Sequence, residues 1–138
     1  MPGVFLDSSA LVKLVVPEPE TDALIAFLGV PRRPVVISEV AVTEVTRAAR
    51  RVGADASDAL AECEIVLLRS ELLLAAARLD PPGLRTLDAI HLVTALGLAD
   101  RLDVFVAYDQ RLLAAAGEHG LVVAPPGYTV SASGGLLP

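Results

Sequence analysis

The sequence predicts an α/β fold in which helices cover both faces of a parallel sheet. Short runs rich in Val, Ile, Leu and Phe alternate with longer segments of helical periodicity. Parallel strands need such crossover helices, and the helices then pack on the two faces of the sheet. We therefore expect an α/β domain with a central parallel sheet of four or five strands.

The first half of the chain is expected to form two strands and three helices. Residues 4–6 form a strand that ends at Asp7, and the serines that follow can cap a helix over residues 8–16, which Pro17 stops. Pro19 opens a second helix that ends at Gly29. After a proline-rich connector, residues 35–37 are expected to form a strand and residues 39–53 a helix.

Two interpretations are open for residues 55–79. The segment is either one helix or a short helix to Glu64, an extended piece over residues 65–68 and a helix capped by Ser70. We favour the second, because the Ile/Val/Leu run loses helical periodicity. The Asp-Pro-Pro-Gly sequence at residues 80–83 is a firm break.

The last third of the domain repeats the alternation of helix and strand. Residues 86–99 form a nearly all-apolar helix that should be buried. Strands are expected at residues 104–107 and 121–124, with a helix over residues 109–117 between them. From Pro125 onward Pro, Gly and Ser dominate, so we expect a domain over residues 1–125 and a loose tail over residues 126–138.

Composition limits the class of protein. With 138 residues, 54% of them hydrophobic, the chain is expected to be one domain with a proper core. No apolar run reaches the roughly 18 residues of a membrane span, and the N-terminus lacks the features of a signal peptide. We therefore expect a cytoplasmic protein with no membrane association.

Cysteine and charge narrow the chemistry further. Cys63 is the single cysteine, which excludes an internal disulfide and a cysteine-based zinc site. The net charge of −6 argues against a broad nucleic-acid surface that works through bulk charge, although a local basic strip is compatible with it. Lys13 is the only lysine, so positive charge comes almost entirely from arginine, which suits bidentate contacts with phosphate or carboxylate.

Three aspartates are expected at one edge of the sheet. Asp7 and Asp109 follow predicted strands, and Asp88 lies in the first turn of the most apolar helix. Each has a structural alternative, because Asp7 and Asp109 can cap helices and a helix dipole stabilises Asp88. Ser8 or Ser9 can cap the first helix equally well, which would leave Asp7 free. Since the carboxyl ends of parallel strands share one edge, the three carboxylates should approach one another there.

Two further residues have a functional and a structural interpretation. In a helical projection Glu44 lies at the border of the buried face, where it either leans into a cleft or pairs with Arg47, Arg51 or solvent. His91 follows Asp88 by three residues, and a hydrogen-bonded structural histidine is favoured over a metal ligand or base.

The four acids together indicate a metal site. Carboxylates this close repel one another and raise one another's pKa values unless a cation neutralises them. The economical cation is Mg²⁺ or Mn²⁺, which prefers oxygen ligands and keeps several waters. Such a site can bind a phosphodiester, turn water into a nucleophile and stabilise the leaving oxygen.

Four segments resemble the PIN-domain endoribonucleases and, within them, the VapC toxins of prokaryotic toxin–antitoxin pairs. The resemblance covers about residues 4–124, and its most specific piece is Leu-Asp-Ala-Ile-His at residues 87–91. The segments are residues 5–13, 38–44, 85–92 and 108–112. Asp7, Glu44, Asp88 and Asp109 fall on the family's four acidic positions, and Ser8 falls on a position whose hydroxyl often helps near the metal.

The resemblance implies a three-layer α/β/α fold and a Mg²⁺- or Mn²⁺-dependent endoribonuclease acting on single-stranded or looped RNA. It also implies a homodimer and an inhibitory VapB-like antitoxin, hence a toxin–antitoxin hetero-oligomer. Asp7 and Asp109 would bind the first metal ion. Glu44 and Asp88 would complete the ligands of that ion, or hold a second ion or the attacking water. In-line attack would leave a 5′-phosphate and a 3′-hydroxyl. The candidate RNA contacts are the basic residues nearest the motifs, Lys13, Arg47, Arg51, Arg85 and Arg111.

The sequence departs from the family pattern in two places. Ala107 stands where relatives often carry Thr or Ser, and residues 53–70 look compressed. The alternatives are a catalytically idle PIN-like protein-interaction module, which four intact acids disfavour, and a phospho-receiver or phosphatase with Asp7 as acceptor. Receivers normally carry an acidic pair after the first strand and a late lysine, whereas serines follow Asp7 here. No glycine-rich phosphate loop supports a nucleotide hydrolase.

Overall fold

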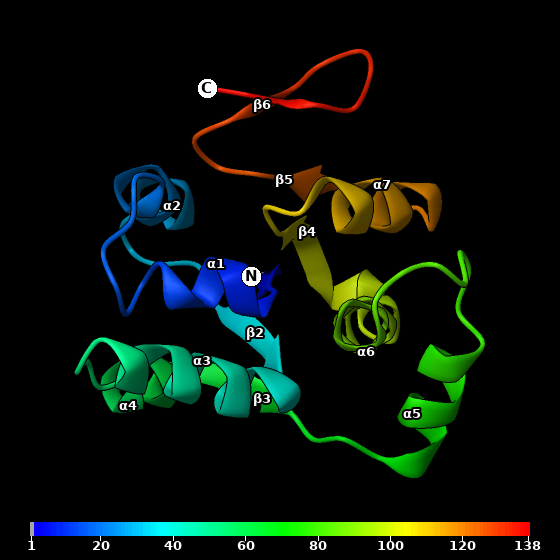
Figure 1. Cartoon of the computed structure of the whole chain (residues 1–138), viewed down its shortest axis with the longest axis horizontal. Helices are drawn as coiled ribbons and strands as arrows, with labels where there is room; N and C mark the ends of the chain where they lie inside the picture. The colour runs from blue at the N-terminus through cyan, green and yellow to red at the C-terminus, as the bar shows by residue number, and fades with distance from the viewer. Residues whose placement is uncertain (1) are drawn as a thin grey trace.

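A five-stranded parallel sheet forms the centre of the computed structural model, which describes residues 2–138 (Figure 1). The strand order is β3-β2-β1-β4-β5, so β1 lies in the middle of the sheet. The five strands are β1 (Gly3–Leu6), β2 (Val35–Ser38), β3 (Cys63–Val66), β4 (Leu102–Val106) and β5 (Val123–Ala124). The predicted three-layer α/β/α architecture is confirmed.

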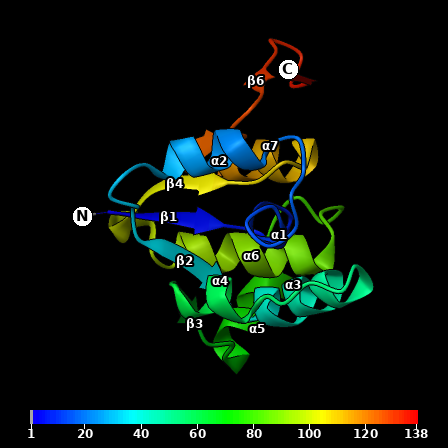
Figure 2. The ribbon, with the colours of Figure 1, turned by 90° about the vertical axis from the view of Figure 1, so that its left-hand side faces the viewer.

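Within residues 2–138, seven α-helices cover the two faces of this sheet; in Figure 1 they lie to the left and right of the strands, and Figure 2 looks onto one covered face. They are α1 (Ser8–Val12), α2 (Thr21–Leu28), α3 (Val40–Arg51), α4 (Ser57–Ala61), α5 (Ser70–Ala77), α6 (Thr86–Leu96) and α7 (Gln110–Glu118), and a 3₁₀ helix, η1 (Ala99–Arg101), precedes β4. Among residues 2–138 no helix is long and apolar enough to cross a membrane.

The alternation of side chains along β1 explains the two hydrophobic layers. Val4 and Leu6 point to one face, where they join apolar side chains of α1, α2 and α3. Phe5 points to the other face, where it stacks on Phe105 at 5.3 Å between ring centroids and joins α6 and α7. Every residue of β1 is buried, as expected for the central strand of a covered parallel sheet.

The chain order of the elements agrees with the sequence prediction, and most differences concern their ends. The favoured order of helix, strand and helix over residues 55–79 is confirmed, although the strand lies at Cys63–Val66 rather than at residues 65–68. Ser70 is the first residue of α5 and not its cap, which is Arg69 without a side-chain hydrogen bond. The first helix ends at Val12 instead of residue 16, because the following amides of Lys13 and Leu14 bond three residues back in turns. Similarly, α6 ends at Leu96, and the next strand begins at Leu102 rather than at residue 104.

The segment after β5 contains a short antiparallel pair, β6 (Thr129–Val130) and β7 (Leu136–Leu137). This pair is separate from the central sheet and lies beyond α7 and β5 (Figure 1). One hydrogen bond joins the start of the segment to the site-bearing part of the domain, because the Tyr108 hydroxyl donates to the Pro126 carbonyl at 2.8 Å.

Candidate functional site

The four predicted acids line one cavity at the carboxyl-terminal edge of the sheet. The cavity has a volume of about 270 Å³. Its lining residues are Asp7, Ser8, Ser9, Glu44, Arg85, Leu87, Asp88, His91 and Asp109. The acids come from the end of β1, from α3, from the first turn of α6 and from the start of α7, so the fold brings together residues that are far apart in sequence.

Asp7 is the most deeply buried of the acids, with 3% of its surface exposed. Its amide donates to the Val106 carbonyl at 3.1 Å, which fixes its backbone beside the end of β4. Its Oδ1 accepts from the Ala10 amide at 2.9 Å, and the Ser9 hydroxyl donates to both carboxylate oxygens. Asp7 is therefore itself the N-cap of α1, so the expectation that a serine would cap this helix and leave Asp7 free was wrong.

Burial makes the negative charge of Asp7 costly. Loss of solvation raises the pKa of Asp7 from 3.8 to about 6, against the opposing hydrogen bond from the Ala10 amide. The nearby Asp88 carboxylate adds to the rise in pKa, while His91 and Ser9 oppose it. A buried acid whose ionised form is destabilised in this way gains most from a cation in the same cavity.

Glu44, on α3, is held by two residues from other helices, Ser8 of α1 and His91 of α6. Its Oε1 accepts from the Ser8 hydroxyl at 2.5 Å and lies 3.0 Å from His91 Nε2. Burial on its own would raise the pKa of Glu44, but the hydrogen bonds from His91 and Ser8 outweigh it and lower that pKa. The alternative in which Glu44 pairs with Arg47 or Arg51 is thus not what the structure shows.

His91 is a hydrogen-bonded residue rather than an open ligand. Its side chain is 2% exposed, its Nδ1 is buried without a hydrogen-bond partner, and its Nε2 also lies 3.1 Å from Ser8 Oγ. A buried donor without an acceptor is costly, so the proton belongs on Nε2, which then donates toward Glu44. The favoured structural interpretation of His91 agrees with these contacts, and its partner is Glu44.

Asp88 and Asp109 are bridged by one arginine. Arg85 Nε donates to Asp88 Oδ2 at 3.1 Å, and Arg85 Nη2 donates to Asp109 Oδ2 at 3.2 Å. The hydrogen bond to Asp88, with the charges of both aspartates, raises the pKa of Arg85 further above its ordinary value. Asp109 also caps α7, because its Oδ1 accepts from the Leu112 amide at 3.0 Å.

The remaining candidate RNA contacts differ in their surroundings. Lys13 is 7% exposed, pairs with Glu18 and Glu20 at 3.4 Å, and lies over the Tyr108 ring. Its expected role as an RNA contact conflicts with this burial, since its charge is already neutralised within the protein. Arg47, Arg51 and Arg111, in contrast, are exposed.

Each carboxylate is thus engaged by the protein in a different direction. Within the described chain, no three His, Cys, Asp or Glu side chains lie where they could together hold a metal ion. Each acid has its own protein partners: Arg85 pairs with Asp88 and Asp109. Ser8 and His91 hold Glu44, and Asp7 accepts hydrogen bonds from its own helix. The donors are nevertheless all carboxylate oxygens, the type that hard divalent cations prefer.

Sequence reasoning missed Ser9 and the role of Arg85 as the partner of two acids. Ser9 lies two residues after Asp7, a spacing at which a hydroxyl regularly reaches a carboxylate, so it could have been predicted. The bridge from Arg85 to Asp109 spans 24 positions and had no local signal.

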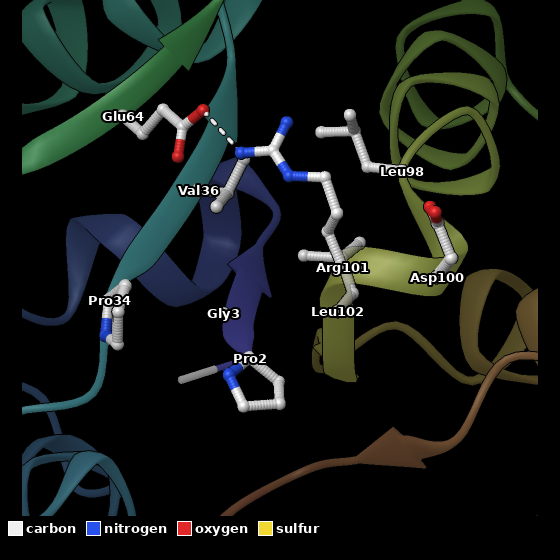
Figure 3. A pocket seen from close by; sticks show the side chains of 9 residues that line it. All are labelled: Pro2, Gly3, Pro34, Val36, Glu64, Leu98, Asp100, Arg101 and Leu102. Atoms are coloured by element: carbon white, nitrogen blue, oxygen red, sulfur yellow. Dashed lines mark hydrogen bonds and ion pairs between the residues drawn. The ribbon is translucent and has the colours of Figure 1, made fainter.

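A second cavity, of about 360 Å³, lies at the opposite, amino-terminal edge of the sheet (Figure 3). Figure 3 shows Arg101 reaching across it toward Glu64, which it contacts at 3.1 Å. Its remaining lining is mostly apolar, and its one other charged residue is Asp100. This cavity lacks a convergence of acids, so the carboxyl-terminal edge is the better candidate for chemistry.

The PIN domain family matches the chain over residues 4–118. Ribonuclease VapC46 of Mycobacterium tuberculosis is 43% identical over 91% of this chain and 99% of its own length. Ribonuclease VapC47 of the same species is 34% identical over 90% of this chain and 97% of its own length.

Solved structures agree on the fold. The VapC20 toxin of M. tuberculosis, described as cleaving the sarcin–ricin loop, superimposes with a TM-score of 0.66 at 16% identity, covering 86% of this chain and 96% of that one. A PilT N-terminus domain protein of Sulfolobus solfataricus gives a TM-score of 0.61 at 17% identity, over 91% and 87%. With the family match, the full-length relatives and four acids in one cavity, the chain belongs to the PIN-domain family and, within it, to the VapC-type ribonucleases.

Proposed function

We propose that this protein is the toxin of a VapBC-type toxin–antitoxin pair and hydrolyses RNA phosphodiester bonds with the help of a divalent metal ion. The observation that carries the proposal is the meeting of Asp7, Glu44, Asp88 and Asp109 in one cavity. Relatives that match nearly their full length are named ribonucleases, which supports the same activity here.

Asp7 and Asp109 are the proposed ligands of the first metal ion. They follow adjacent strands, β1 and β4, whose pairing brings Leu6 opposite Val106. Glu44 and Asp88 would complete this site or hold a second ion or the attacking water. When bound, Mg²⁺ or Mn²⁺ supplies Lewis-acid activation of the scissile phosphate and of water. A bound cation would also offset the cost of ionising Asp7, which comes mainly from burial and in smaller part from Asp88.

Glu44 is prepared for its role by the protein itself. Its lowered pKa keeps the carboxylate ionised near neutral pH, and Oε1 is fixed by Ser8 and His91. Across residues 2–138, Oε2 makes no hydrogen bond to the protein, so it is the oxygen able to accept from a water molecule. We propose that this oxygen orients the attacking water for in-line displacement, which leaves a 5′-phosphate and a 3′-hydroxyl.

Arg85 has two consecutive roles in the proposal. Its guanidinium uses the Oδ2 atoms of Asp88 and Asp109, oxygens that a metal ion in this cavity would also need. If these two oxygens held the ion, Arg85 would have to leave at least one of the two aspartates. The side chain is 71% exposed, so it can turn to the solvent side, where a released guanidinium suits an RNA phosphate.

A VapB-like antitoxin is the proposed inhibitor. The Arg85 bridge demonstrates that a guanidinium fits the Asp88 and Asp109 carboxylates, so an arginine presented by an antitoxin could occupy the same pair. We also propose a homodimer, supported by exposed apolar side chains near the edge strand β3 and on α5, among them Leu67, Leu73 and Leu74.

Expression of the chain alone in a bacterial host tests the function. The wild type should arrest growth and cut specific RNAs, whereas Asp7→Asn and Asp88→Asn should do neither. Asp100→Asn is the matched control, because Asp100 is exposed and lines the opposite cavity. It should remain as toxic as the wild type.

Two results would count against the proposal. Equal toxicity from the wild type, Asp7→Asn and Asp88→Asn would refute the assignment of the site. Purified protein without metal-dependent RNase activity, unchanged by Asp7→Asn, would instead favour a catalytically idle interaction module.

A further inference from the structure

The last two turns of α3 carry a further cavity, which is basic and distinct from the two cavities described above. It has a volume of about 270 Å³ and is lined by three residues only, Arg47, Arg50 and Arg51. All three are exposed. The net charge of the chain is −6, so this cluster of positive charges contrasts with the negative charge of the chain as a whole.

None of these three arginines is neutralised by an acid of the described chain. Four other arginines pair with carboxylates at 2.9 to 3.2 Å: Arg32, Arg33, Arg85 and Arg101. A helix C-terminus favours cations, which gives a structural reason for Arg50 and Arg51 in the last turn of α3. The helix C-terminus does not explain Arg47, which lies one turn earlier. It also does not explain why three guanidinium groups line one cavity.

The basic cavity lies further along the helix that carries Glu44 of the acidic site. Glu44 and the arginines at positions 47 and 51 are three and seven residues apart, so they lie on one side of α3. At about 1.5 Å per residue, the two arginines follow Glu44 by roughly 4.5 and 10 Å along the helix axis. This distance is in the range of one or two nucleotides of an extended strand.

We infer that Arg47, Arg50 and Arg51 bind phosphates of the RNA strand next to the scissile bond. The inference rests on the proposed function, because it assigns the neighbouring part of the same substrate. An acidic catalytic cavity repels a polyanion, so a substrate strand needs compensating positive charge nearby. Guanidinium groups without internal acids can provide it by bidentate contacts. An acidic protein segment would match the charge, but the shared face with Glu44 favours RNA.

The test is the salt dependence of RNA binding. A fluorescently labelled single-stranded RNA of about 12 nucleotides is titrated with protein in EDTA, which prevents metal-dependent hydrolysis. The Arg47→Gln/Arg51→Gln double variant is compared with Arg69→Gln/Arg78→Gln, which changes the net charge equally at exposed arginines of the α5 region. Glutamine is a good helix former, so α3 should persist, and thermal unfolding verifies this.

The expected result is a weaker and less salt-dependent complex. Loss of two phosphate contacts should reduce the slope of log K against log salt by roughly 1.4, and adding Arg50→Gln should bring the reduction to roughly 2. The control should keep the wild-type slope. Equal slopes for the α3 variant and the control would overturn the inference. If the α3 variant also lost binding to polyglutamate, the cavity would belong to an acidic protein partner instead.

The inference and the proposed function fail in different ways. If the wild-type protein cleaves RNA and the α3 variants bind RNA like the wild type, only the inference that the basic cavity binds RNA is overturned. If the wild-type protein binds RNA through these arginines but cleaves no RNA with Mg²⁺ or Mn²⁺, only the proposed nuclease function is overturned. Absence of RNA binding by the wild type would overturn both.

Discussion

The two halves of the acidic cavity are built in different ways. On one side, Glu44 is fixed by Ser8 and by His91, whose side chain is 2% exposed. On the other side, Asp88 and Asp109 are joined by Arg85, whose side chain is 71% exposed. The Glu44 half is thus held by hydrogen bonds from a half-buried serine and a buried histidine, while the other half is held by an exposed guanidinium that a competing cation can replace.

This difference suggests a division of labour. A hydrogen-bond network with a buried partner fixes the direction of one carboxylate, as expected for a group that orients water or completes a ligand set. An exposed guanidinium offsets part of the negative charge of two carboxylates that line the cavity. Asp7 differs from both halves, because burial is the main cause of its raised pKa.

The largest expected effect concerns Asp7. In EDTA, Asp7→Asn should increase the free energy of unfolding near neutral pH. The folded-state pKa of about 6 exceeds the ordinary 3.8, so the folded protein holds this proton more tightly than the unfolded chain does. The stability contributed by the protonated acid is therefore complete below about pH 4 and is lost as the pH rises through about 6. The difference corresponds to about 3 kcal/mol, less any loss from the altered cap.

Denaturant unfolding at several pH values measures this effect. The gain from Asp7→Asn should be small below about pH 4 and reach its plateau above about pH 7, since asparagine still caps a helix. Saturating Mn²⁺ should abolish or reverse the gain. A difference between variant and wild type that does not change with pH would contradict the account of Asp7.

The second prediction concerns variants that disrupt the Glu44 half of the cavity. His91→Ala removes the buried donor to Glu44 and should lower kcat roughly 10- to 100-fold, the usual effect of losing a residue that orients a metal-site ligand. His91→Gln can present a donor from the same position and should recover much of the activity. The comparison is made with single-turnover RNA cleavage, with unfolding curves as a measure of the cavity left by Ala. Equal activity of the Gln and Ala variants would show that His91 only fills space.

The third prediction concerns a variant that disrupts the half of the cavity in which Arg85 joins Asp88 and Asp109. Arg85→Gln should tighten Mn²⁺ binding about two- to tenfold in calorimetric titration, because the ion no longer competes with the guanidinium. RNA binding should weaken if the released side chain contacts phosphate. Arg101→Gln is the matched control, since Arg101 pairs with Glu64 at 3.1 Å at the opposite edge. Weaker Mn²⁺ binding by Arg85→Gln would mean that Arg85 supports the metal site.

The smallest expected effect tests the network within the Glu44 half. Ser8→Ala leaves the His91 contact in place and should lower kcat by only a few-fold, because His91 still holds the same Oε1. Combined with His91→Ala, the loss should differ from the sum of the two single losses, because both residues bond the same Oε1. Strict additivity in this double-mutant cycle would show that the two contacts act independently.

The sequence was sufficient to predict where the acids would lie but not what would hold them. Strand-end placement located Asp7 and Asp109, because parallel strands share one carboxyl edge. Helical projection placed Glu44 at the border of the buried face, and the structure places it at the cavity. These inferences use periodicity and topology, which a single chain carries.

The contacts inside the site were beyond such reasoning. Ser8 and Glu44 are 36 positions apart and Glu44 and His91 are 47 apart, and no local pattern specifies which rotamers meet. Lys13 illustrates the same limit. Its position after a motif suggested an RNA contact, whereas the structure buries it with Glu18 and Glu20.

The most direct measurement is a crystal structure of the protein soaked with Mn²⁺, read from the anomalous signal of the metal. The account predicts a peak within coordination distance of the Asp7 and Asp109 carboxylates, with Arg85 withdrawn from at least one of its two aspartates and His91 still bonded to Glu44. A structure with Arg85 still on both aspartates and no peak in the cavity, at a Mn²⁺ concentration that supports cleavage, would contradict it.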